Sequence, residues 1–222
     1  MLLWQQLQEA IRINHLQQVL FLLEKHHLPL DAPDPSNGFT CLFYAIQYHQ
    51  SDLFQYFISH VTLDFNKNTP LMMSIAFNNS IAFHALLQNY PLMAFQSNVD
   101  GKTPMLLAVE KGHTLFVKYL IECDCDVNQS LPDGSSPLHL ACAWGYFDLV
   151  TLLMQSNAQL TSNRKGFTPL DYCYSDDMRA HLLHCADALK LNKPIITPKR
   201  REPEVRGNQQ ATAYVSYLRT IF

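Results

Sequence analysis

Short apolar blocks alternate with polar turns along most of this chain, and the unit they form recurs about every 33 residues. Five copies begin with Thr or Ser, usually followed by Pro, and carry a small residue five positions later. The copies start at Thr40, Thr69, Thr103, Ser136 and Thr168, and their small residues are Ala45, Ser74, Ala108, Ala141 and Cys173. The intervals between successive starts are 29, 34, 33 and 32 residues. Five copies in register predict a repeat architecture.

Each copy predicts a pair of helices. Thr or Ser before Pro can cap the first helix, because its hydroxyl can accept a hydrogen bond from a free backbone N–H, and Pro suits the first helical position. Nine positions after the start, where that helix should end, Asn78, Gly112 and Gly145 favour a left-handed conformation. His49 occupies this position in the first copy, so we expect that repeat to turn differently. Paired apolar residues then predict a second helix at 57–58, 86–87, 120–121 and 153–154.

The Thr-Pro-Leu-His-x-Ala pattern at this period resembles that of the ankyrin-repeat family. The resemblance covers about residues 3–190 and is strongest over 100–113 and 133–146. It implies an all-α solenoid of helix–turn–helix units with short β-turn fingers, capped at both ends and followed by a C-terminal tail.

We therefore expect an ankyrin-repeat domain over residues 1–190. Its expected parts are an N-terminal capping repeat at 1–35, repeats at 36–66, 67–99, 100–132 and 133–164, and a C-terminal capping repeat at 165–190. In the last of these, Ser175-Asp176-Asp177 can cap a helix with Met178, Leu182, Cys185, Ala186 and Leu189 on one face. Residues 191–222 form the expected basic linker and short amphipathic C-terminal helix.

Composition indicates a protein of a reducing compartment. No apolar run approaches the roughly 18 residues that cross a membrane, and the N-terminus lacks the pattern of a secretory signal. The six cysteines fall mostly where the repeat frame would bury them, which favours free thiols. We expect a cytoplasmic protein, and nuclear entry stays open as an alternative.

Charge is unevenly distributed along the chain. Residues 1–189 hold 9 Lys and Arg against 17 Asp and Glu, a net charge of −8, whereas residues 190–222 hold 7 against 2, a net charge of +5. The asymmetry suggests either attraction between tail and repeats or two surfaces for different partners. Because phosphate contacts need a basic face, the repeats are not expected to bind nucleic acid.

The resemblance implies that another protein binds in a concave groove lined by the fingers and the first helices. The position eight residues after each start faces that groove in the family, and here it holds Tyr48, Phe77, Lys111, Trp144 and Asp176. Aromatic anchors dominate binding energy at interfaces, so we predict Tyr48, Phe77 and Trp144 as anchors. Tyr44 would extend the patch by one helical turn, and Lys102 and Lys111 would set specificity.

The C-terminal tail supplies a second candidate motif. Lys199, Arg200 and Arg201 could serve nuclear import or contact an acidic surface, or belong to a solvated linker. After them, Tyr214, Tyr217, Leu218 and Ile221 fall on one face of a predicted helix. That face either docks on the acidic repeats or enters the groove of a partner.

The sequence lacks the motifs of the enzyme classes considered. It contains no Gly-rich phosphate loop and no HExxH-type metal pair. Cys173, Cys185 and His184 could be drawn as a catalytic set, but no third orienting group accompanies them. We therefore expect no catalysis, no cofactor, no metal and no small-molecule substrate.

The sequence predicts a monomeric, non-enzymatic adaptor or regulator that binds a protein partner, for example as an escort or inhibitor of a basic protein. A second hypothesis is an ankyrin-type effector that intracellular bacteria deliver into host cells, where it would bind host proteins. The C-terminal tail would then be the secretion signal.

Overall fold

The computed structural model describes residues 2–190, and every regular element in that range is helical. The elements are α1 (Leu2–Arg12), α2 (Leu16–Lys25), α3 (Cys41–Gln47), α4 (Ser51–Phe57), α5 (Pro70–Ala76), α6 (Ser80–Asn89), η1 (Pro91–Phe95), α7 (Pro104–Glu110), α8 (Thr114–Glu122), α9 (Pro137–Trp144), α10 (Phe147–Gln155), η2 (Pro169–Tyr172) and α11 (Asp176–Lys190). The predicted tail motifs at 199–201 and 214–221 lie outside the described residues.

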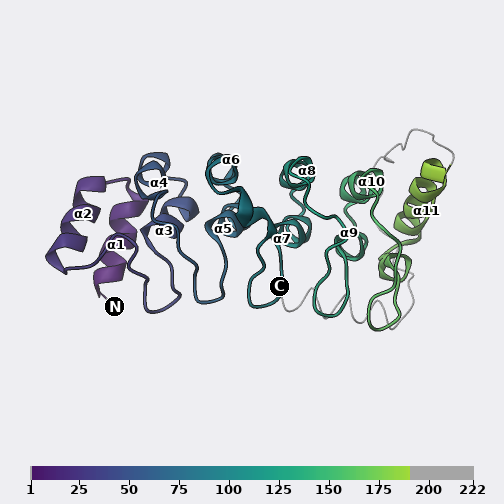
Figure 1. The fold of residues 1–222 in the computed structure, drawn as a ribbon, viewed down its shortest axis with the longest axis horizontal. Helices are drawn as coiled ribbons and strands as arrows, with labels where there is room; N and C mark the ends of the chain where they lie inside the picture. Colours follow the sequence, from purple (N-terminus) through teal and green to yellow (C-terminus); the bar gives the residue numbers. More distant parts are fainter. Residues whose placement is uncertain (1, 191–222) are drawn as a thin grey trace. The chain divides into compact units, whose positions relative to one another are not determined.

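Within residues 2–190 the chain divides into two compact units, one up to Pro104 and the other from Met105 onward. In the first unit, α1 packs on α2, α3 on α4, and α5 on α6, while α3 also contacts both α1 and α5. The first helices of these pairs therefore form one layer and the second helices another (Figure 1). The 3-10 turn η1 packs against α6.

In the second unit, α10 packs on α8, α9 and α11 (Figure 1). The last repeat has only the 3-10 turn η2 where a first helix was expected, and η2 packs on α9. Within residues 2–190, no helix is long and apolar enough to span a membrane.

The first helices end in a common backbone arrangement. Asn14, His49, Asn78, Gly112 and Gly145 all have left-handed backbones, with φ between 52° and 75°. In each case the N–H of the following residue donates to the carbonyl of the small residue five positions earlier, as Gln50 does to Ala45 at 2.9 Å. This bond is that of a Schellman motif. The expectation that the repeat at His49 turns differently was wrong, because the same bond imposes the conformation on histidine.

The caps predicted for the first helices are less uniform. Thr69 accepts a hydrogen bond from the N–H of Met72 at 3.2 Å, as expected. Ser136 forms a capping box with His139, in which the His139 Nδ1 accepts from the Ser136 N–H at 3.1 Å and lies 2.8 Å from its hydroxyl. The Thr40 hydroxyl is buried and has no hydrogen-bond partner within residues 2–190. The same residue type thus caps one repeat and only fills space in another.

The segments that join one helix pair to the next form narrow turns, here called the fingers (34–39, 64–68, 98–102, 131–135 and 163–167). Each finger is closed by a backbone hydrogen bond between its first and last residues, from 2.7 Å at the first finger to 3.2 Å at the second. A left-handed residue lies near each tip: Gly38, Lys67, Gly101, Gly134 and Gly166. Lys67 shows that a finger without glycine adopts the same turn.

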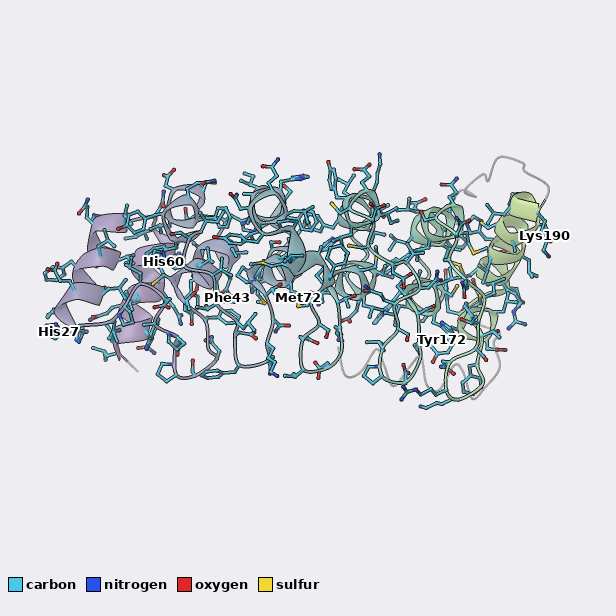
Figure 2. The ribbon with its side chains drawn as sticks, in the orientation of Figure 1. His27, Phe43, His60, Met72, Tyr172 and Lys190 are labelled. Atoms are coloured by element: carbon cyan, nitrogen blue, oxygen red, sulfur yellow. The ribbon has the colours of Figure 1, made fainter. Side chains whose placement is uncertain are left out.

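Apolar side chains from both helix layers fill the interior of each unit. Phe43 and Met72, which come from α3 and α5, are buried in the first unit (Figure 2). In the closing helix α11, Met178, Leu182 and Cys185 are buried as predicted. Leu189 is exposed, and Ala188 is buried instead, so the buried face of α11 is rotated from the predicted stripe at its C-terminal end.

Candidate functional site

Two of the predicted aromatic anchors lie at equivalent places in the first unit. Tyr48 ends α3 and Phe77 ends α5, and each backbone N–H donates at 2.9 Å to the carbonyl four residues earlier. Both side chains are half-buried. A half-buried aromatic ring offers a partner a large apolar area while its orientation stays restricted by its neighbours.

Tyr44 does not extend this aromatic surface, and the expectation that it would was wrong. It is 2% exposed, and its ring stacks on Tyr48 with ring centres 6.4 Å apart. Its hydroxyl donates to Asp34 at 2.7 Å and lies 2.8 Å from the Gln8 amide nitrogen. Tyr44 therefore packs against the Tyr48 ring in the interior and is not accessible to a partner.

Lys102 occupies the end of the third finger. Its backbone N–H donates to the side-chain oxygen of Asn98 at 2.9 Å, and its carbonyl accepts from the Asn98 N–H at 3.0 Å. The side chain is half-buried. The finger therefore fixes the backbone of Lys102.

In the second unit, Lys111 and Trp144 occupy the equivalent helix ends. Lys111 follows α7 and is exposed, and its N–H donates to the carbonyl of Leu107 at 3.0 Å. Trp144 is the last residue of α9 and is half-buried. Asp176, the fifth residue in this register, begins α11 and is exposed. Its place differs from that of the others because η2 replaces a complete first helix.

A polar cluster at the first finger was not predicted from the sequence. The Asp34 carboxylate accepts hydrogen bonds from Ser36, from the Tyr44 hydroxyl and from Gln8, the last at 3.4 Å. Burial acts to raise the pKa of Asp34, but the hydrogen bonds from Ser36, Tyr44 and Gln8 outweigh it and lower the pKa. The carboxylate is thus ionised at neutral pH. No local sequence pattern brings Gln8 to Asp34, because Gln8 comes from a helix 26 residues earlier.

The residues Cys173, Cys185 and His184, which the sequence analysis rejected as a catalytic set, do not all lie together in the interior of the structure. Cys173 and Cys185 are buried, whereas His184 is exposed. The imidazole near Cys185 is His181, whose Nε2 lies 3.6 Å from the thiol and 2.9 Å from the Thr151 hydroxyl. Burial raises the pKa of the Cys185 thiol and lowers that of His181. This cluster belongs to the packing between α10 and α11.

Comparison with known proteins identifies the repeat. The family described as ankyrin repeats (3 copies) matches residues 7–93, 60–130, 82–164 and 117–192. Neurogenic locus notch homolog protein 1 of Danio rerio is 30% identical over 150 residues, which are 65% of this chain and 6% of that protein. The target of rapamycin complex 2 subunit AVO2 of Saccharomyces cerevisiae is 25% identical over 176 residues, which are 74% of this chain and 41% of that protein.

The chain therefore spans only a small part of the Notch relatives it matches and less than half of the yeast subunit. Among solved structures, the ankyrin repeat domain of Bcl-3 aligns with a TM-score of 0.60 at 20% identity, over 79% of this chain and 96% of that one. This likeness shows a shared fold. Because the family match extends from residue 7 to residue 192, the chain belongs to the ankyrin-repeat family.

Proposed function

We propose that this protein is a non-enzymatic adaptor or regulator that binds a protein partner through the ends of its first helices and its fingers. The observation that carries the proposal is the recurrence of large, half-buried aromatic side chains at equivalent helix ends: Tyr48 and Phe77 in one unit and Trp144 in the other. Tertiary packing holds each of these rings at the surface, and such rings supply much of the binding energy of protein interfaces.

The relatives support a role in protein interaction. One is named as a subunit of target of rapamycin complex 2, and another, the mouse protein phosphatase 1 regulatory subunit 12A, is 35% identical over 78 residues. Both names describe proteins that act within assemblies. The family relationship supports the general role, and the partner of this chain is a separate question.

The net charge of the repeats indicates which kind of partner surface they would bind. The net charge of −8 over residues 1–189 favours a partner with a basic surface, because complementary charge steers encounter and excludes like-charged competitors. Lys102 and Lys111 are local cations on the proposed surface, so they would contact acidic or polar groups within that partner. We propose that they set specificity while the aromatic rings supply affinity.

The test uses a triple variant and a matched control in the full chain. Tyr48→Ala, Phe77→Ala and Trp144→Ala together remove the proposed anchors. The control, Tyr56→Ala, Ile81→Ala and Leu115→Ala, removes three exposed apolar side chains from the second helices, again two in one unit and one in the other. Each protein serves as bait in lysate from the source organism, and captured proteins are identified by mass spectrometry and measured again in purified form.

We expect a partner that wild type and control both retain and that the triple variant binds at least about tenfold more weakly. Circular dichroism and thermal melting establish that each bait is folded. Since Trp144 is half-buried, the exposed substitution Lys111→Glu is measured as well, because it changes the surface without opening the interior. A partner that all variants bind equally would contradict the proposed surface.

A further inference from the structure

A surface cavity of about 440 Å³ lies beside the first finger. Its lining residues are Trp4, Gln5, Gln8, Asp34, Pro35 and Ser36, contributed by α1 and by the finger. Gln5, Pro35 and Ser36 are exposed, whereas Trp4 and Asp34 are buried. The volume falls within the range of pockets that bind small ligands or single side chains.

The cavity contains an ionised carboxylate whose hydrogen-bond donors are all neutral. Asp34 is 3% exposed, and its Oδ1 accepts from the N–H and the hydroxyl of Ser36 at 2.8 and 2.6 Å. Its Oδ2 accepts from the Tyr44 hydroxyl at 2.7 Å and, at the long distance of 3.4 Å, from Gln8. Within residues 2–190 no cationic side chain forms an ion pair with Asp34. Neutral donors satisfy both oxygens, so the negative charge is hydrogen-bonded but not neutralised by a cation, and it makes the electrostatic potential of the cavity negative.

The finger itself does not require that charge. In the second finger, Asp64 likewise accepts from the N–H two residues later, that of Asn66 at 2.9 Å, and also from that of Asn68 at 2.7 Å. In the third and fifth fingers an amide oxygen is enough, since Asn98 and Asn163 accept the corresponding bonds. Asp34 differs in the partners of its second oxygen, which come from α3 and α1, whereas the second oxygen of Asp64 accepts from Asn68 within its own finger.

We propose that this cavity binds the side chain of an arginine from a basic protein partner, an inference that rests on the proposed protein-binding function and names one contact of it. The guanidinium group is planar and weakly hydrated, and it combines favourably with a carboxylate, with amide oxygens and with an aromatic ring. Asp34, the amides of Gln5 and Gln8, and the Trp4 indole supply these groups in one cavity. A lysine ammonium is more strongly hydrated and has no planar face to place against the indole.

The experiment titrates short peptides into the full chain carrying Trp144→Phe. The sequence contains two tryptophans, so Trp4 then reports alone by fluorescence. The probe is an acetylated tri-arginine amide, and the matched peptide replaces each arginine with citrulline, which has nearly the same shape but no charge. Asp34→Asn keeps an acceptor oxygen for the finger, as Asn98 and Asn163 show, while it removes the charge. Asp64→Asn removes one charge from the next finger and serves as the control.

We expect saturable binding of the arginine peptide, no binding of the citrulline peptide, and an affinity at least about tenfold lower after Asp34→Asn but within about twofold of the parent after Asp64→Asn. Equal losses in the two variants would show attraction to net charge alone and overturn the site. Equal binding of both peptides would overturn the requirement for a cation. Circular dichroism checks that both variants remain folded.

A further variant distinguishes the partner from the chain's own arginines. If replacing Arg200, Arg201, Arg206 and Arg219 by Gln in the full chain raises peptide affinity fivefold or more, the tail occupies the cavity and the proposed occupant is wrong. The proposed function is tested separately by the anchor variants and their captured partner. Loss of the peptide site with retention of anchor-dependent capture would therefore reject the cavity and leave the protein-binding function intact.

Discussion

The hydroxyl of Tyr44 donates a 2.7 Å hydrogen bond to the Asp34 carboxylate, and this bond joins α3 to the finger that precedes it. Burial, and then the carboxylate itself, raise the pKa of Tyr44, so its hydroxyl keeps its proton and remains a donor at neutral pH. Gln8 from α1 and Asn37 from the finger also contact this oxygen, at 2.8 and 3.1 Å. The bond thus fixes the first finger between two helix pairs.

Tyr44→Phe tests the contribution of this bond. The substitution leaves the ring in place and removes a buried hydrogen bond to a charged group, so we expect the free energy of unfolding to fall by about 1.5–3 kcal/mol. Urea unfolding at pH 7, followed by circular dichroism, measures the change. Tyr48→Phe, at the half-buried ring stacked above it, should change stability by less than about 0.5 kcal/mol. Equal effects of the two substitutions would contradict the assignment.

The two equivalent threonines Thr40 and Thr69 should respond oppositely to valine. Thr69 caps α5 through its hydroxyl, so Thr69→Val should destabilise by about 1 kcal/mol. The buried Thr40 hydroxyl lacks a hydrogen-bond partner within residues 2–190, so Thr40→Val should be neutral or stabilise by up to about 1 kcal/mol. Thermal and urea unfolding of both variants provide the comparison. A loss at Thr40 as large as that at Thr69 would show that the Thr40 hydroxyl is bonded in solution.

Alanine substitutions at two left-handed glycines, Gly145 and Gly166, distinguish the cost of backbone strain from the cost of steric overlap. Gly145 and Gly166 have φ values of 75° and 82°, so alanine is strained at either position. At Gly145 the added methyl group would also overlap the ring of Tyr174, whereas at Gly166 it would meet nothing within 4 Å. We expect a loss of about 1–2 kcal/mol for Gly166→Ala and at least about 1 kcal/mol more for Gly145→Ala. Chemical unfolding of the two variants measures the difference, and similar losses would show that the Tyr174 ring moves aside freely.

Stability should fall as the pH drops below the range in which histidine is neutral. Burial lowers the pKa of His139 and of His181, while hydrogen bonds to the carbonyls of Phe167 and Phe147 oppose the shift. In the unfolded chain both residues titrate near a pKa of about 6.5. Below that pH the unfolded state binds more protons than the folded state, so protonation favours unfolding. The free energy of unfolding should decrease by at most about 1.4 kcal/mol per pH unit for each residue, until the folded-state pKa is reached.

Urea unfolding between pH 7.5 and 5.5 tests this dependence. His181→Gln retains a group able to bond the Thr151 hydroxyl but cannot titrate, so the variant should lose about half of the slope attributed to the two residues. His184→Gln, at an exposed position on the same helix, should reduce the slope by less than His181→Gln does, because the charge of His184 contributes to the low pKa of His181. A wild-type stability that stays constant over this range would contradict the burial of neutral imidazoles.

The repeat frame was recoverable from the sequence because its signals act locally. Thr69 before Pro70 and the glycines at 112 and 145 affect the backbone of their own turn, so spacing alone located the helix pairs. His49 and Lys67 show the limit of this reasoning. Neither residue is glycine or asparagine, the usual residues at a left-handed helix end, yet each adopts that conformation because hydrogen bonds on both sides of the turn determine the backbone there.

Side-chain placement on the candidate surface was less predictable. Tyr44 and Tyr48 lie one helical turn apart, so helical spacing placed them on one face. The first finger and Gln8 cover Tyr44, and no local pattern specifies how those segments meet. Tyr48, Phe77, Lys111 and Trp144 were located at the helix ends by the repeat frame, whereas their exposure depends on neighbouring repeats.

The sequence by itself determined the family, the order of the helix pairs and the places where the first helices end, since each follows from a periodic pattern of short-range preferences. Only the tertiary structure decided that Asp34, Tyr44 and Gln8 form one cluster beside a cavity. Asp34 and Tyr44 lie 26 and 36 positions after Gln8 along the chain, and the three residues meet because adjacent helix pairs stack. Stacking depends on the fit of whole surfaces, which a repeat period does not encode.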